Sequence, residues 1–264
     1  MKFDAVIVGG GHNGLTTAAY LAKKLQRVLV LESRHLVGGA SVTEELIPGF
    51  KFSRGSYLSG LLRPKVISEL NLASLHNLTL LPRPHHSFTP SLIHEGQSLL
   101  MSNDMVFTQN EIAKFSAKDA AQYPLYCDKL SKFARILDNV IDSIPPDISH
   151  PQLKLNATKL SSINFSEHLQ TLQRLIPSVA ALSDKNDAAD FISLLLAPAE
   201  DILNSHFESE ILKSTLATDA VIGALVSPKT PGSGYVLLHH VMNDGNWSYV
   251  EGGMGGERAK RALM

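Results

Sequence analysis

The residues from Gly9 to Gly14 have the types and the spacing that bind a diphosphate. Gly9, Gly11 and Gly14 match the G-x-G-x-x-G pattern, in which each glycine has a mechanical role. Gly9 permits a tight turn, Gly11 lets the backbone approach a pyrophosphate, and Gly14 allows a helix to lie close to a strand. Gly10 completes the turn. A helix that begins here presents unpaired N–H groups and roughly half a positive charge, which favour a bound diphosphate.

The elements around this turn have to form a βαβ unit if the turn is to bind a dinucleotide. Residues 4–8 and 28–31 are apolar runs, typical of parallel strands that are covered on both faces. Residues 15–25 carry apolar side chains at helical spacing, with small alanines that let a helix lie against a sheet. We expect the crossover between the two strands to be right-handed.

Glu32 ends the second strand, about 20 residues after the glycines, where a carboxylate can accept hydrogen bonds from ribose hydroxyls. The same charge repels a 2′-phosphate, so NADP is disfavoured. Ser33 and Arg34 follow directly and are included in the predicted cofactor site.

Five residues separate Glu32 from the pair Gly38 and Gly39. This arrangement resembles the extended fingerprint of FAD-binding oxidoreductases, in which the glycine pair lets the backbone pass close to the cofactor phosphates. FAD is therefore the predicted cofactor. An NAD-dependent dehydrogenase is the weaker alternative, because both cofactors share the first part of the fingerprint.

Residues 6–15, together with the segments 29–32 and 38–39, resemble the amine-oxidase and phytoene-desaturase superfamily, and the later segments are similar to one branch of it. The resemblance implies an α/β fold, with a Rossmann-like FAD-binding βαβ domain and an inserted, mostly helical substrate domain. Family members are longer, and the C-terminal half of the family fold has no counterpart in this chain. The resemblance also implies a mitochondrial (matrix) location, with a cytoplasmic one as the alternative. The similar segments are residues 6–15, 29–32, 38–39, 43–54, 215–224 and 231–240.

We expect the chain to divide into three parts. Residues 1–75 form the first segment of the FAD-binding domain, residues 76–229 the substrate or cap domain, and residues 230–264 a return segment toward the FAD-binding domain. Ser116 and Asp119 mark the start of a long helix, whose free N–H groups their side chains are expected to satisfy. Later elements are expected at residues 187–226 (helical), 235–242 (helical) and 247–250 (strand).

The activity implied by the resemblance is FAD-dependent removal of hydride from a small organic substrate, with a hydrophobic one favoured. Because a flavin ring itself accepts the electrons, no catalytic residue is assigned. Arg54 and Tyr57 lie where the resemblance places the flavin–substrate boundary, and Trp247 and Tyr249 are also considered near the flavin; ordinary packing is the alternative for all four. The rival hypothesis is a catalytically silent form that binds a nucleotide or a protein partner.

Composition argues against several other classes. The formal net charge is −1, whereas nucleic-acid binders usually carry a basic excess for phosphate contacts. Cys127 is the single cysteine, which rules out an intrachain disulfide, a two-cysteine redox centre and a Cys-based metal site. The adjacent histidines at 85–86 and 239–240 have diverging side chains, so no metal site is predicted. We expect neither a membrane-spanning segment nor a secretory signal peptide.

Overall fold

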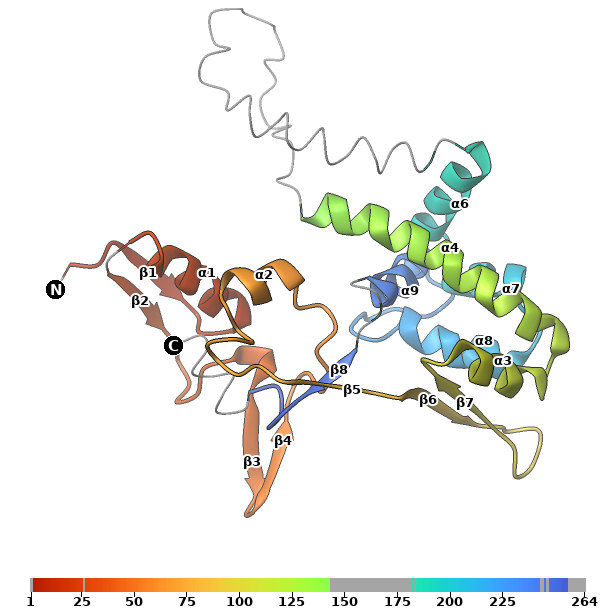
Figure 1. Ribbon diagram of the computed structural model, residues 1–264, viewed down its shortest axis with the longest axis horizontal. Coiled ribbons are helices and arrows are strands. Elements are labelled where there is room, and N and C mark those ends of the chain that lie inside the picture. The colour runs from red at the N-terminus through yellow and green to blue at the C-terminus, as the bar shows by residue number, and fades with distance from the viewer. Residues whose placement is uncertain are drawn as a thin grey trace, which may run out of the picture. The chain divides into compact units, whose positions relative to one another are not determined.

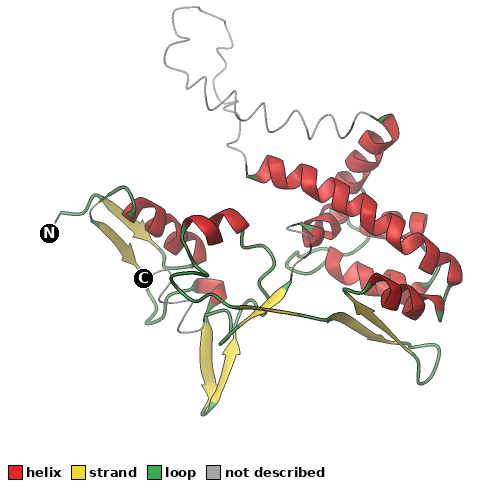
Figure 2. Cartoon of the chain, in the orientation of Figure 1, coloured by secondary structure: helices red, strands yellow, loops and turns green. Residues whose placement is uncertain are grey.

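The computed structural model describes residues 2–25, 27–142, 182, 184–242, 245 and 247–255. The chain forms two compact units, one from residues 1–83 and 245–264 and the other from residues 84–244. Figure 1 follows the chain through both units by residue number, and Figure 2 distinguishes their helices from their strands. The part of the predicted return segment beyond residue 255 lies outside the described residues.

The first unit begins with the predicted βαβ arrangement, which is confirmed. Strand β1 (Ala5–Val8), helix α1 (His12–Ala22) and strand β2 (Val28–Leu31) follow one another. The two strands are parallel neighbours, and Figure 1 shows α1 beside them. Helix α1 begins earlier than its apolar pattern indicated, because Gly11 already serves as its N-cap, with φ −73° and ψ 172°.

The β1–β2 sheet is covered on one face among the described residues, which differs from the expectation of strands buried on both faces. Ile7 faces α1, since its Cγ2 lies 3.5 Å from the position of a Cβ added to Gly14. Val6, Val8 and Leu31 are exposed at 52%, 85% and 48%. Within the described chain β1 and β2 pair only with each other, so the sheet is too narrow to bury this second face.

The remainder of the first unit is built from short elements that follow β2. Strands β3 and β4 form an antiparallel hairpin, and Gly49 at its tip has φ +84°, a conformation that favours glycine. Strand β5 pairs antiparallel with β8, which comes from the end of the described chain. These elements are η1 (Gly39–Ser41), β3 (Thr43–Ile47), β4 (Phe50–Ser53), α2 (Pro64–Glu69), β5 (Leu80–Pro82) and β8 (Ser248–Val250).

Hydrogen bonds from backbone N–H groups to side-chain hydroxyls fix the segment after β8 to the β3–β4 hairpin. The Met254 N–H donates to the Ser53 hydroxyl at 3.1 Å, and the Gly255 N–H donates to the Thr43 hydroxyl at 2.9 Å. A Cβ on Gly255 would lie 2.5 Å from the Thr43 nitrogen, so glycine is needed for this close approach. Residues far apart in the sequence thus complete the same unit.

The described residues of the second unit are mostly helical, with an antiparallel hairpin of β6 (His85–Pro90) and β7 (Ser98–Ser102). Its core joins side chains of β7 and of the helices, among them Phe133, Leu203 and Leu238, each almost completely buried. The elements are β6 (His85–Pro90), β7 (Ser98–Ser102), α3 (Met105–Ala113), α4 (Ala117–Ile141), α6 (Lys185–Leu196), α7 (Ala199–His206), α8 (Glu210–Ala217), η3 (Thr218–Ala220) and α9 (Ser233–Val241).

The start of α4 was predicted correctly, but the role of one of its residues was not. Ser116 caps the helix, accepting a hydrogen bond from the Asp119 N–H at 3.1 Å. The fully buried Asp119 carboxylate serves a different helix, accepting from the backbone N–H groups of Glu208 at 3.0 Å and Ser209 at 2.8 Å. These donors lie directly before α8, so Asp119 ties the start of α4 to the start of α8.

Candidate dinucleotide-binding site

The glycine turn between β1 and α1 has the close contacts that its fingerprint requires. Gly9 has φ +103°. A Cβ on Gly14 would lie 2.1 Å from the Gly9 carbonyl oxygen, far inside van der Waals contact. Only a glycine at position 14 therefore lets α1 begin directly against the end of β1.

The space beside Gly11 is different, because the protein itself leaves it open. A Cβ on Gly11 would have Gly39 Cα as its nearest neighbour, at 3.9 Å. Glycine at this position is therefore not required by the folded chain alone. The open space, next to the first N–H groups of α1, is the room that a bound diphosphate needs for its approach.

The pair Gly38 and Gly39 lies directly against this turn. The Gly38 N–H donates to the Gly10 carbonyl at 2.7 Å, and Gly38 and Gly11 form a parallel bridge. Both glycines have positive φ, +124° and +59°. A Cβ on Gly39 would lie 3.0 Å from Gly11 Cα, so the close approach of the two glycine segments leaves little room for a side chain at position 39.

Glu32 is held at the edge of the turn by both of its carboxylate oxygens. Oε2 accepts from the Gly10 N–H at 2.7 Å, while Oε1 accepts from the Arg34 N–H at 3.0 Å and the Ser33 hydroxyl at 3.3 Å. The hydrogen bond from Arg34, followed by that from Gly10, lowers the pKa of Glu32 below its usual value. An ionised carboxylate has about four lone-pair sites, so acceptor capacity remains for ribose hydroxyls.

The structure thus brings together all the residues predicted for the cofactor site, and it adds one that the sequence reasoning missed. Glu44 of β3 accepts from the Arg34 guanidinium at 2.6 Å and from the Arg54 guanidinium at 3.0 Å. The signal that could have found it is the Pro48-Gly49 turn, since a hairpin there brings residues before and after it side by side.

The structure places the aromatic residues weighed for the flavin boundary in the first unit, and their closeness to a flavin stays a prediction. The Trp247 ring lies against the backbone of Gly60, where an added Cβ would be 2.4 Å from Cδ2 of the indole. Tyr249 lies on β8 opposite Leu81 and is 49% exposed. Tyr57 is 60% exposed.

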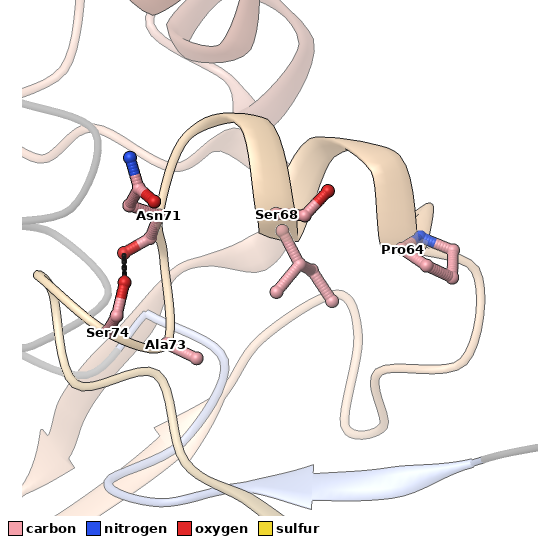
Figure 3. Close-up of a pocket in the computed structure, with 6 residues that line it drawn as sticks. Pro64, Ser68, Asn71, Ala73 and Ser74 are labelled. Atoms are coloured by element: carbon pink, nitrogen blue, oxygen red, sulfur yellow. Dashed lines mark hydrogen bonds between the residues drawn. The ribbon is translucent and has the colours of Figure 1, made fainter.

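A shallow hollow of about 390 Å³ lies elsewhere in the first unit, along α2 and the turn that follows it (Figure 3). None of the predicted cofactor residues lines it, and its lining has no charged side chain that could bind a phosphate. We therefore do not assign the cofactor to it. The hollow is lined by Pro64, Ile67, Ser68, Asn71, Ala73 and Ser74.

Other reactive groups in the described residues do not form a second site. Burial raises the pKa of the Cys127 thiol to about 11, which keeps it protonated near neutral pH. The described parts of the chain contain no group of three or more His, Cys, Asp or Glu side chains that could hold a metal ion. In the same residues, no helix combines the length and the apolar character needed to cross a membrane.

Comparison with known proteins agrees with this geometry. Residues 7–63 match the family model described as an NAD(P)-binding Rossmann-like domain. The solved structure of a putrescine oxidase mutant, from a redesign of cofactor binding, superposes with a TM-score of 0.53 at 17% identity, over 98% of this chain and 49% of that one. The chain thus contains a Rossmann-like dinucleotide-binding domain, and its fold is similar to that of the oxidase.

Among the similar curated proteins is the mouse pyridine nucleotide-disulfide oxidoreductase domain-containing protein 2, which is 46% identical over 96% of this chain and 44% of its own length. One of the limonene dehydrogenase subunits of Castellaniella defragrans is 36% identical over 46% of this chain and 21% of its own length. The chain therefore spans less than half the length of the relatives it matches. The disulfide in the first relative's name has no basis within this chain, whose single cysteine is Cys127.

Proposed function

We propose that the chain binds FAD at the glycine turn and that its parent activity is the oxidation of an organic substrate by hydride removal. The observation that carries the proposal is the combination at Gly10 and Gly11. An ionised Glu32 is bound to the turn at 2.7 Å, next to open space at Gly11 that the folded chain leaves unfilled.

Different residues of the site would bind different parts of the cofactor. The N–H groups at the start of α1 and the open space at Gly11 would receive the diphosphate. Glu32 would orient the adenosine ribose through its hydroxyls, and it would repel a 2′-phosphate. Gly38 and Gly39 would let the chain pass close to the phosphates. A bound flavin supplies the electron acceptor, so the chain's own residues need only bind and orient.

A hydrophobic substrate is the finer part of the proposal. It is supported by the similarity to a protein of limonene dehydrogenase, because limonene is an apolar hydrocarbon. The family resemblance of residues 215–224 and 231–240 in the helical unit supports the same direction.

The test is a calorimetric titration of the purified chain with FAD, NAD⁺ and NADP⁺ in parallel. We expect FAD to bind most tightly and NADP⁺ least. Glu32→Gln should weaken FAD binding roughly ten- to hundredfold, as expected for a lost hydrogen bond between a charged group and the ribose. Tighter binding of NAD⁺ than of FAD would refute the cofactor assignment. A folded chain that binds none of the three would favour the silent protein-binding form.

A further inference from the structure

Arg54 and Glu44 stand outside the sequence fingerprint, yet they are joined to the predicted nucleotide site. We propose that Arg54 binds the diphosphate of the dinucleotide, and that Glu44 is the positioning residue that holds the guanidiniums of Arg54 and Arg34 together. This inference rests on the proposed function, because it assigns a further residue of the same site.

A continuous chain of hydrogen bonds connects the glycine turn to Arg54. It runs from the Gly10 N–H to the Glu32 carboxylate, which also accepts from the Arg34 N–H. The Arg34 guanidinium donates to Oε1 of Glu44, and the Arg54 guanidinium donates to Oε2 of the same carboxylate. Each carboxylate is thus fixed from two sides, and the two arginines share one anchor.

Backbone packing brings the segment that carries Arg54 close to the phosphate turn. A Cβ on Gly55 would lie 2.9 Å from the Ala40 carbonyl oxygen, so the chain after Arg54 passes directly against Ala40. The residue before Ala40, Gly39, is in equally close contact with Gly11. The Gly38–Ala40 turn is therefore in contact both with the Arg54 segment and with Gly11, where the diphosphate is proposed to bind.

The charges complement a diphosphate. Residues 9–16 contain no lysine or arginine, so the turn itself supplies only backbone N–H groups. The hydrogen bond from Arg34 is the main cause that lowers the pKa of Glu44, which is therefore ionised. The Arg34 and Arg54 guanidiniums and the Glu44 carboxylate together carry one net positive charge, while the ionised Glu32 carboxylate at the Arg34 N–H is assigned to the ribose. Their side chains are 44% and 50% exposed, and each guanidinium has five N–H donors, so donors remain for phosphate oxygens.

The experiment measures the affinity of the full chain for ADP and for adenosine by calorimetry. The variants are Arg54→Gln, Arg54→Lys and Glu44→Gln, with Lys51→Gln as the matched control, because Lys51 is an exposed cation on the same hairpin. We expect Arg54→Gln to weaken ADP binding about three- to tenfold and to leave adenosine binding unchanged. Arg54→Lys should recover part of the loss, and Lys51→Gln should match the wild type.

Glu44→Gln is the most decisive variant, because two explanations of Glu44 predict opposite changes in the affinity for ADP. If Glu44 were only a negative charge near an anion, its neutralisation would tighten ADP binding. As the positioning residue for two arginines, its loss should weaken ADP binding. This inference is overturned if the wild type binds ADP and Arg54→Gln binds it equally well, or if Glu44→Gln binds ADP more tightly. Either result leaves the proposed function standing. A wild-type chain that binds neither ADP nor FAD overturns the proposed function and the inference with it.

Discussion

Replacement of Gly14 by alanine has two opposing effects on the stability of the protein, one from helix propensity and one from steric contact. Gly14 lies in the first turn of α1, and alanine is favoured over glycine in a helix by about 1 kcal/mol. Propensity alone therefore predicts a more stable protein. The contact with the Gly9 carbonyl predicts the reverse, so the sign of the change in the free energy of unfolding decides between them.

The size of the effect follows from the contact distance. The added Cβ would lie 2.1 Å from the Gly9 carbonyl oxygen. A relaxed carbon–oxygen contact is about 3.3 Å, so the backbone has to move by roughly 1 Å. Overpacking of this kind costs about 1–3 kcal/mol, and the upper end applies because the contacted atom belongs to the backbone. After subtraction of the helix gain, Gly14→Ala should destabilise the first unit by about 2 kcal/mol.

The assay is urea unfolding followed by tryptophan fluorescence. Trp247 is the single tryptophan, it belongs to the first unit, and its ring lies against Gly60, so its signal reports the unit that carries the mutation. A loss of about 2 kcal/mol should lower the urea midpoint by about 1–2 M.

Gly11→Ala is the matched control in the same turn. Its Cβ meets nothing closer than 3.9 Å, and the poorer helix cap that alanine makes is offset by the lower entropy of the unfolded chain. Its unfolding midpoint should therefore stay close to that of the wild type while its nucleotide binding is lost. An unchanged or raised midpoint in Gly14→Ala would refute the steric argument for the turn. A large loss of stability in Gly11→Ala would show that its space is needed by the fold rather than by a ligand.

Two further predictions concern the helical unit. Asp119→Ala should lower the free energy of unfolding by roughly 2–4 kcal/mol, because the N–H groups of Glu208 and Ser209 lose their acceptor, and circular dichroism in urea measures it. Asp119→Asn, which keeps a carbonyl oxygen, should lose less, and equal stability of the Ala variant and the wild type would contradict the role. Burial raises the pKa of Cys127 to about 11 in the folded chain, which means that the folded state favours the neutral thiol. The resulting contribution to the free energy of unfolding should be fully present below the pKa of the unfolded chain and lost as pH rises through the folded value. Thiol labelling at pH 8 should therefore be slow in the folded chain and fast in urea; equally fast labelling in both states would refute it.

The sequence was sufficient for the local parts of the nucleotide site. The βαβ unit, its glycine turn and Glu32 are set by contacts within one short stretch of chain, where turn chemistry and apolar periodicity decide the structure. The same reasoning found the Ser116 cap, because a cap depends on the residues that follow it directly.

What the sequence could not predict depends on contacts between distant residues. The partner of the Asp119 carboxylate is the segment before α8, and no local pattern indicates that pairing. Glu44 was missed although the Pro48-Gly49 turn indicates the β3–β4 hairpin, because the ion pair with Arg54 depends on which side chains that hairpin brings together. The exposure of Val8 likewise depends on how many strands flank β1, which is a property of the whole sheet and not of the strand.

The central claim is that the glycine turn holds FAD, and the absorption spectrum of the desalted protein tests it most directly. The purified chain and its Gly11→Ala variant are incubated with FAD, and unbound cofactor is then removed. We predict that the wild type retains a visible flavin band and that the variant, folded to the same extent, retains none. A colourless wild type, or equal flavin in both proteins, would contradict the account.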